Sequence, residues 1–314
     1  MILKENVSGG YYMKPTCCRK AFLAMGLGVG LMAALPMTSC APAGSGTAKP
    51  SFTKETYPKV DGSTATIPLS ESIAAELLSL TSEEAHSFIK HNTTHNAYVN
   101  LIDGTADIIF VTEPSEEELK LAKEKGVELQ VVPVVKEAFV FLVNKQNPVD
   151  VLTVKQIRDI YQGIATNWNE LGGTDKEIIA YQRPENSGSQ TIMEKQVMEN
   201  LKMAAAPTSL KPGVMGELID AIASYDNSDK AIGYSVYYYA NSMYSKDTIK
   251  FIKVNGIEPN NKSISSGDYP FTSAYYAVLR KTEPANSGSR KLLDWILSTD
   301  GQKLAEKAGY VPLK

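Results

Sequence analysis

The chain contains 314 residues, with 32 lysines and arginines against 35 aspartates and glutamates. This length suits one large domain or two of ordinary size. The near-neutral charge does not favour a nucleic-acid partner, so any anion site has to be local. Of the three cysteines, Cys17, Cys18 and Cys40, the first two fall in a segment that we expect to be removed, so no internal disulfide is predicted.

Residues 1–39 have the pattern of an export signal. A basic stretch precedes the apolar run of residues 21–35, which is shorter than the roughly 20 residues that span a bilayer. The run ends in "MTSC" at Cys40, which resembles a bacterial lipobox, whose cysteine is lipidated. The alternative is a free cysteine behind an ordinary signal peptide. Translation starts at Met1 or Met13, and small residues predict a flexible tether over 40–59.

Helical and strand patterns alternate from residue 60 onward. Residues 69–80 and 115–126 have the spacing of amphipathic helices, and residues 106–112 form a short apolar run typical of a strand. Residues 129–144 predict two buried strands, joined or bent at Pro133.

The second half of the chain continues this alternation. Residues 153–163 predict a helix that closes at Gly163, and residues 177–183 predict a strand. Residues 289–309 predict a closing pair of helices. Such alternation is typical of an α/β protein.

Three strand–turn–helix junctions have turns rich in serine and threonine, at residues 61–68, 92–96 and 183–190. A helix N-terminus offers unpaired N–H groups and the positive end of a dipole. Several converging termini can therefore hold a tetrahedral oxyanion. Taken singly, each turn is equally an ordinary N-cap.

Arg183 favours the anion interpretation for the third turn, because a guanidinium matches two phosphate oxygens. Glu185 is a candidate to hold the guanidinium in place. A second Asn-Ser-Gly-Ser turn, residues 286–289, has Glu283 where the first has Arg183. Since a carboxylate repels an anion, we interpret this second turn as a cap alone.

Two other site types are disfavoured. His86, His91 and His95 do not align on one helix face and lack an H-E-x-x-H pattern, so no metal is predicted. There is no G-x-S-x-G elbow for a serine hydrolase, so we expect no enzyme. The tyrosines of "GYSVYYYANSMY" are interpreted as packing at a strand or domain interface, with a sugar-stacking platform as the alternative.

Between Val60 and Leu313 the chain contains, in this order, the motifs "DGSTATIPL", "DGTADIIFVTEP", "IRDIYQGIATNWNELGG", "RPENSGSQT", "KAIGYSVYYYA", "SGDYPFTSAYYAVL" and "TDGQKLAEKAGYVPL". In these motifs and their order it resembles the substrate-binding proteins of phosphate-specific ABC transporters. The resemblance implies a two-lobed periplasmic-binding-protein fold of type II, each lobe a sheet flanked by helices, joined by two crossing strands. Lobe one then comprises residues 60–138 and 241–314, and lobe two residues 139–240.

The resemblance also implies which residues contact phosphate. These are Ser63, Thr64, Thr66, Thr94, Thr112, Arg183, Ser187, Gly188 and Ser189. Two departures stand out: Thr112-Glu113 replaces the family's frequent Ser-Arg, and His95-Asn96 replaces its usual glycines. Glu113 either accepts a hydrogen bond from protonated phosphate and repels sulfate, or points away into solvent.

The sequence therefore predicts an exported, lipid-anchored, monomeric protein that captures inorganic phosphate and delivers it to an ABC permease, without a cofactor. One alternative is the same clamp binding another oxyanion or a small phosphorylated metabolite. Another is a sensor or scavenger without a permease of its own.

Overall fold

The computed structural model of the protein describes residues 49–199, 201–227 and 229–314. The predicted signal, the lipobox with Cys40 and the first part of the tether lie outside the described residues. Among the described residues, no helix has the length and apolar character needed to cross a bilayer.

A continuous set of paired strands forms the centre of the described chain, in the order β1-β2-β9-β3-β6-β5, with β7 also paired to β3. The strands are β1 (Val60–Gly62), β2 (Ile108–Val111), β3 (Leu129–Asn144), β5 (Ile179–Ala180), β6 (Ala231–Val236), β7 (Ile249–Phe251) and β9 (Thr272–Arg280). A separate parallel pair joins β4 (Val151–Leu152) to β8 (Lys253–Val254). β1 pairs parallel with β2, and β5 parallel with β6, whereas β3 and β9 are antiparallel.

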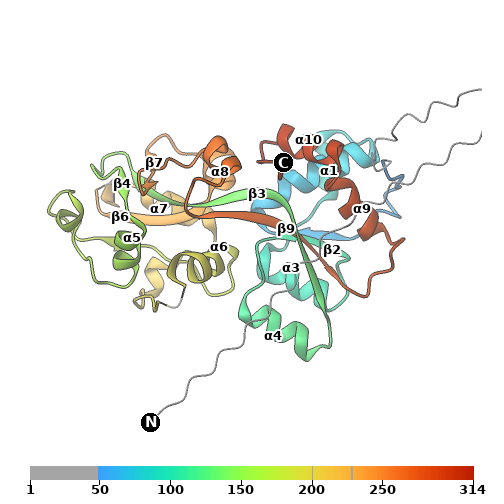
Figure 1. Ribbon diagram of the computed structural model, residues 1–314, viewed down its shortest axis with the longest axis horizontal. Coiled ribbons are helices and arrows are strands. Elements are labelled where there is room, and N and C mark those ends of the chain that lie inside the picture. Colours follow the sequence, from blue (N-terminus) through green and yellow to red (C-terminus); the bar gives the residue numbers. More distant parts are fainter. Residues whose placement is uncertain (1–48, 200, 228) are drawn as a thin grey trace, which may run out of the picture. The chain divides into compact units, whose positions relative to one another are not determined.

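β3 is one strand of 16 residues that connects two lobes (Figure 1). Its register against β9 shifts between Pro133 and Val135, as expected where proline cannot donate to the ladder. The two strands predicted on either side of Pro133 are therefore one continuous strand with a register shift at this proline. β3 pairs with β9 up to Ala138, and from Phe139 it pairs with β6 instead. The strand therefore leaves the first lobe and enters the second between these two residues.

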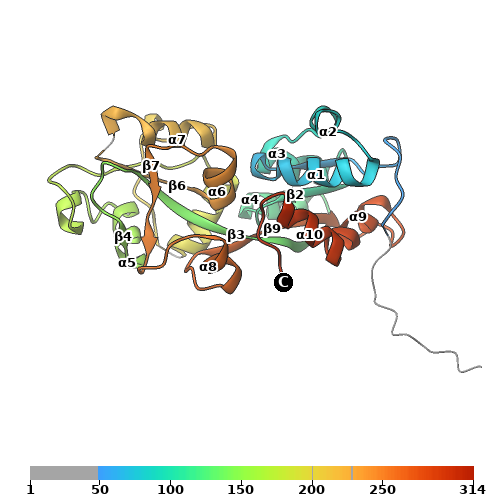
Figure 2. The same cartoon turned by 90° about the horizontal axis from the view of Figure 1, so that it is seen from above.

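The helices surround the two parts of β3 (Figures 1 and 2). Those of lobe one are α1 (Ile67–Leu78), α2 (Ser82–Phe88), α3 (Thr93–Ile102), α4 (Glu116–Glu124), α9 (Gly288–Ile296) and α10 (Thr299–Lys307). Those of lobe two are α5 (Val154–Tyr161), α6 (Gly188–Ile192), α7 (Met215–Ala223) and α8 (Asn261–Ser266). α6 continues directly into a π-helical turn, Met193–Met198.

Local sequence signals explain where several helices begin. Ser115 opens α4 with a capping box, in which its hydroxyl accepts the Glu118 N–H and the Glu118 carboxylate accepts the Ser115 N–H. Thr153 opens α5 with the same arrangement. In α1, Leu69, Ile73 and Leu77 are buried on one face, as their four-residue spacing predicted.

The lobe boundary predicted near Asn241 differs from the observed pairing. β7 pairs with the second part of β3, and β8 pairs with β4. Residues 249–254 therefore lie in lobe two, and the chain returns to lobe one only near β9, where Phe139 N donates to Phe271 O (2.9 Å). These pairings join residues about a hundred positions apart, so local patterns could not reveal them.

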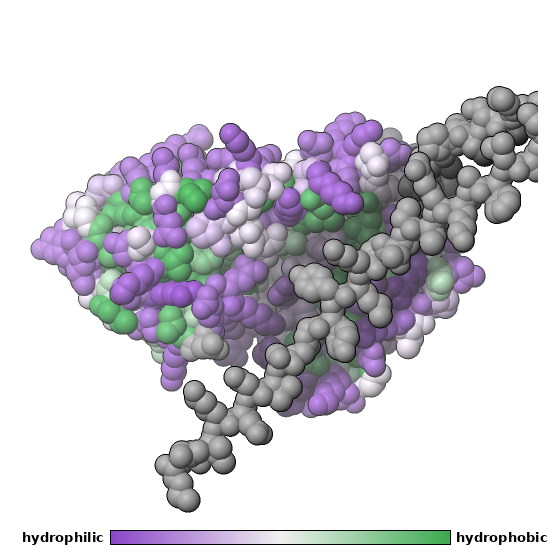
Figure 3. Space-filling model, viewed as in Figure 1, coloured by the Kyte–Doolittle hydropathy of each residue, from purple (hydrophilic) through white to green (hydrophobic). Residues whose placement is uncertain are grey.

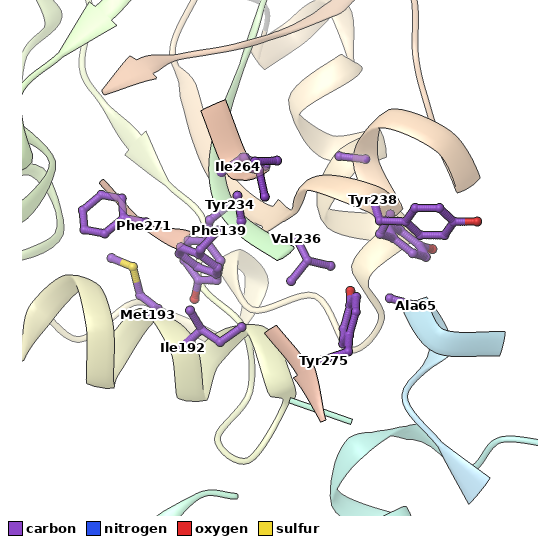
Figure 4. Close-up of a cluster of buried hydrophobic side chains, with 14 of the residues drawn as sticks. Ala65, Phe139, Ile192, Met193, Tyr234, Val236, Tyr238, Ile264, Phe271 and Tyr275 are labelled. Carbon is purple, nitrogen blue, oxygen red and sulfur yellow. The ribbon is translucent and has the colours of Figure 1, made fainter. Parts of the chain in front are cut away.

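Aromatic side chains pack where the two lobes meet (Figure 4). Phe139 lies 5.1 Å from Tyr234, measured between ring centroids. Tyr238, which follows β6, stacks on Tyr310 near the C-terminus at 3.8 Å. Part of the tyrosine run therefore packs at the interface between lobes. Large apolar residues that remain exposed, such as Ile164, are scattered, and hydrophilic residues dominate the face in Figure 3.

Candidate functional site

A cavity of about 350 Å³ lies between the two lobes. Its walls come from the strand–turn–helix junctions of both lobes. The lining residues are Ser63, Thr64, Ala65, Thr93, Thr94, His95, Thr112, Arg183, Pro184, Glu185, Asn186, Ser187, Gly188, Ser189, Gly213, Val214, Met215, Val236, Tyr239 and Tyr275. Ala65, Val236 and Tyr275 also belong to the apolar cluster of Figure 4, so one wall continues into the core.

The first junction, between β1 and α1, presents Ser63 and Thr64 to the cavity. Ser63 N donates to Phe110 O of β2 (2.9 Å), which holds the turn against the sheet. Thr66 was predicted to contact phosphate, but the structure does not place it at the cavity. It is fully buried, its hydroxyl donates to Phe110 O (2.7 Å), and it does not line the cavity. Thr66 therefore holds the turn in position through its contact with β2 and does not face the cavity.

Asp61 connects the first junction to the second. Its carboxylate accepts hydrogen bonds from Gly62 N and Asn92 N, both at 2.7 Å, and from the Asn100 side chain, also at 2.7 Å. Asp61 is 3% exposed, so these donors satisfy a buried charge. Nothing local to Asp61 predicts this role, because Asn92 and Asn100 lie 31 and 39 residues away.

At the second junction, Thr93 has a backbone φ of +72°. This left-handed conformation is rare for a β-branched residue and costs about 1–3 kcal/mol. Thr93 is followed by Thr94 and His95 in the first turn of α3, and all three line the cavity. Strained backbone concentrates at functional sites, and here it directs the start of a helix toward the cavity.

The third junction fixes Arg183 from several sides. Its backbone N donates to Tyr234 Oη of β6 (2.9 Å) and to Gln190 Oε1 of α6 (3.1 Å). The guanidinium Nη1 donates to Pro212 O (2.7 Å). Arg183 is only 8% exposed, and burial lowers the pKa of its guanidinium.

No carboxylate lies within ion-pair distance of Arg183 among the residues that the structure describes. Glu185 was predicted to hold the Arg183 guanidinium in place. It lines the same cavity but forms no ion pair with Arg183 within the described residues. A buried charge without an ion-pair partner is costly. The arrangement is therefore suited to an anion supplied from outside the chain.

Four residues of the cavity wall have a buried polar atom without a hydrogen-bond partner within the described chain: Arg183 Nε, Thr112 Oγ1, Ser189 Oγ and Tyr275 Oη. Each can donate a hydrogen bond. Buried polar groups are normally satisfied, so donors from both lobes that converge on one cavity indicate an acceptor-rich ligand.

At Gly188 the two lobes approach each other closely. An added Cβ would lie 2.5 Å from Thr112 Oγ1 and 2.8 Å from Thr94 Oγ1. Ser187 opens α6, and its hydroxyl accepts Gln190 N (3.4 Å). Only glycine permits this approach of α6 to lobe one.

Further contacts join the lobes beside the cavity. Lys195 Nζ donates to Pro114 O (2.8 Å) and lies 3.5 Å from Glu116 Oε1, and the Asn186 amide donates to Glu117. These side chains are partly or largely exposed, so their contribution is modest.

Glu113 does not line the cavity. Its Oε1 accepts a hydrogen bond from Tyr276 Oη (2.8 Å), and it borders a separate small space with Lys195 and Ser273. It therefore points neither toward the main cavity nor into open solvent.

The three histidines share no partner: His86 pairs with Glu71, His91 with Ser63 O and Ser70, and His95 with Glu118. No group of three potential metal-binding side chains occurs within residues 49–199, 201–227 and 229–314.

The second Asn-Ser-Gly-Ser turn opens α9 and does not line the main cavity. Ser287 accepts Arg290 N (3.3 Å), and Glu283 accepts from Arg280 and Ser289.

Residues that line the cavity without having been predicted include Tyr239, Val214 and Met215. The tyrosine run signalled a packed surface, but nothing local to these segments indicated that they face a cavity.

The chain is similar to known phosphate-binding proteins. A model of the PBP superfamily domain matches residues 44–300. The phosphate-binding protein PstS of Staphylococcus saprophyticus is 26% identical over 230 residues, which cover 70% of this chain and 69% of that protein. PstS of Pseudomonas aeruginosa is 27% identical over 235 residues, which cover 68% and 70%.

A solved structure of a Clostridium perfringens protein with bound phosphate matches with a TM-score of 0.63 at 24% identity. The match covers 82% of this chain and all of that chain. It confirms the two-lobed α/β fold predicted from the sequence.

Proposed function

This chain belongs to the PBP superfamily, and we propose that it captures inorganic phosphate between its two lobes. The observation that carries the proposal is Arg183, a buried guanidinium at the cavity wall without a carboxylate partner in the described chain. The names of the PstS relatives agree with a phosphate ligand.

The donors of the cavity fit a small dianion. Arg183 and the hydroxyl of Ser189 belong to lobe two, whereas the hydroxyl of Thr112 belongs to lobe one. Each hydrogen bond to a charged group contributes about 1.5–3 kcal/mol. A few of them reach the roughly 8 kcal/mol of micromolar binding. A ligand that bridges both lobes stabilises the closed form more than the open one, so binding drives closure without any chemical step.

The predicted contacts Ser63, Thr64, Thr94, Ser187 and Gly188 belong to the same proposed site, because all of them line the cavity. Thr66 is proposed as a positioning residue. Glu185 is the carboxylate that lines the cavity. It can accept a hydrogen bond from protonated phosphate and would repel sulfate, which carries no proton near neutral pH.

Titration calorimetry of the purified protein with phosphate, sulfate and molybdate tests this function. We expect phosphate to bind with a dissociation constant of about 1 µM or lower, and sulfate at least about tenfold more weakly. No heat of binding with phosphate would contradict the proposal. Tighter binding of another oxyanion would favour the alternative ligand class.

We also propose that the protein is an extracytoplasmic lipoprotein, anchored through Cys40, that acts as a monomer and delivers phosphate to an ABC permease. The support is the "MTSC" motif after a basic and apolar leader. Mass spectrometry of the protein purified from its native membrane should find a lipid on an N-terminal Cys40. Replacing Cys40 with alanine should release the protein from the membrane fraction. An unmodified Cys40 in a secreted protein would contradict the anchor and leave phosphate binding unaffected.

A further inference from the structure

His95 and Glu118 form a pair at the lobe-one wall of the cavity. His95 lies in the first turn of α3 and lines the cavity, and its Nδ1 is 3.1 Å from Glu118 Oε1 of α4. The His95 side chain is 36% exposed, whereas that of Glu118 is 1% exposed. The carboxylate is therefore buried behind a histidine that faces the cavity.

When the Glu118 carboxyl is ionised, its contacts assign the tautomer of His95. Glu118 Oε2 accepts the Ser115 N–H (2.7 Å), and Oε1 faces His95 Nδ1. Since both carboxylate oxygens act as acceptors, Nδ1 is the donor of the pair. Burial raises the pKa of the Glu118 carboxyl, and the hydrogen bonds from Ser115 and His95 act in the opposite direction. A second proton, on Nε2, gives the imidazolium, which balances the buried carboxylate.

The ionisable residues that line the cavity come from both lobes. Lobe two contributes Arg183, which has no ion-pair partner within the described residues, and Glu185. The lobe-one lining consists of neutral residues apart from His95. A protonated His95 would therefore place a cation on the lobe-one side of the cavity, where its attraction for phosphate adds to that of Arg183.

Other ionisable groups near this wall have different partners. Glu113 accepts from Tyr276, and Glu117 accepts from Asn186. Asp61 is bonded to backbone and amide donors. His91 lies behind the first junction, with Nδ1 2.8 Å from Ser63 O, and burial lowers the pKa of its imidazole. His91 therefore favours the neutral form, and His95 remains the histidine that can supply charge to the cavity.

We propose that His95, held by Glu118, is a second cationic ligand-binding residue of this site and faces the phosphate from lobe one, opposite Arg183. This inference rests on the proposed phosphate function. It implies that phosphate affinity decreases as pH rises and the imidazolium loses its proton.

Phosphate titrations of the wild-type protein and of His95→Gln, between about pH 6 and pH 8 where histidine changes charge, test the proposal. We expect His95→Gln to weaken binding about tenfold at the acidic end, with the difference shrinking toward the basic end. Phosphate ionises identically in both titrations, so the difference between the proteins reports on His95. His95→Lys, which stays charged, should restore much of the affinity and reduce its decline with pH.

His86→Gln is the matched control. His86 also pairs with a glutamate, its Nδ1 lying 2.7 Å from Glu71 Oε1, but its side chain is 76% exposed and does not line the main cavity. We expect its phosphate affinity to equal that of the wild type at every pH.

Nuclear magnetic resonance of the three histidine rings provides a measurement without mutation. Adding phosphate should shift the His95 ring signals toward those of imidazolium and leave His86 unchanged. If the wild type binds phosphate while His95→Gln keeps the same affinity at every pH, or the His95 signals stay neutral, the His95 inference is overturned and the phosphate function stands. If the wild type binds no phosphate, both are overturned.

Discussion

Arg183→Ala is expected to weaken phosphate binding about 100-fold or more in calorimetric titration. The guanidinium is buried at the cavity wall, and its Nε has no partner within the described chain. Loss of two charge-assisted hydrogen bonds corresponds to about 3–6 kcal/mol. Arg183→Lys keeps a charge but loses the planar fork, so we expect an intermediate affinity.

The stability of the ligand-free variant distinguishes a binding role from a structural one. Arg183 Nη1 makes one hydrogen bond, to Pro212 O, and has no ion pair within the described residues. Removing an uncompensated buried charge should therefore leave the free energy of unfolding unchanged or slightly higher. A large loss of stability without phosphate would identify Arg183 as a structural residue. Wild-type phosphate affinity in Arg183→Ala would contradict its role in binding.

Gly188→Ala is expected to weaken phosphate binding by about tenfold to a hundredfold, because it prevents the lobes from closing fully. Its Cβ would lie 2.5 Å from Thr112 Oγ1 and 2.8 Å from Thr94 Oγ1, both on the opposite lobe. Overpacking of this kind costs about 1–3 kcal/mol, and each 1.4 kcal/mol is a factor of ten in affinity. When the lobes separate, the clash disappears, so the stability of the ligand-free protein should change little.

Gly288→Ala provides the matched control for this clash. Gly288 occupies the same place in the second Asn-Ser-Gly-Ser turn, but the nearest atoms to its added Cβ lie at 3.5 Å. We expect wild-type affinity for Gly288→Ala. Small-angle X-ray scattering with phosphate should show a less compact Gly188→Ala protein. Equal compactness and affinity would show that α6 does not meet lobe one in the ligand-bound form.

The sequence predicted those features that depend on residues close together in the chain. The bend of β3 at Pro133 follows from proline chemistry, and the start of α6 at Ser187 follows from its capping hydroxyl. Arg183 was predicted as a site residue because it is a cation close before the capping Ser187 in the sequence. The structure places Arg183 and this turn at the main cavity.

Features that depend on contacts between residues far apart in the chain could not be predicted from the sequence. The pairing of β7 with β3 places residues 249–251 in lobe two, contrary to the predicted boundary near Asn241. Thr66 has the same chemistry as its neighbour Thr64, and only its contact with Phe110 shows that it faces inward. The pair of His95 and Glu118 joins two helices, so neither residue alone predicted it.

The attachment of residue 49 to lobe one bears on how the molecule would work at a membrane. Lys49 forms an ion pair with Glu76 of α1 (2.7 Å), and β3 and the chain leading into β9 connect this lobe to the other. If Cys40 carries the proposed lipid, the membrane anchor joins the chain on the side of lobe one. Closure around a ligand would then move lobe two relative to the lobe that carries the anchor.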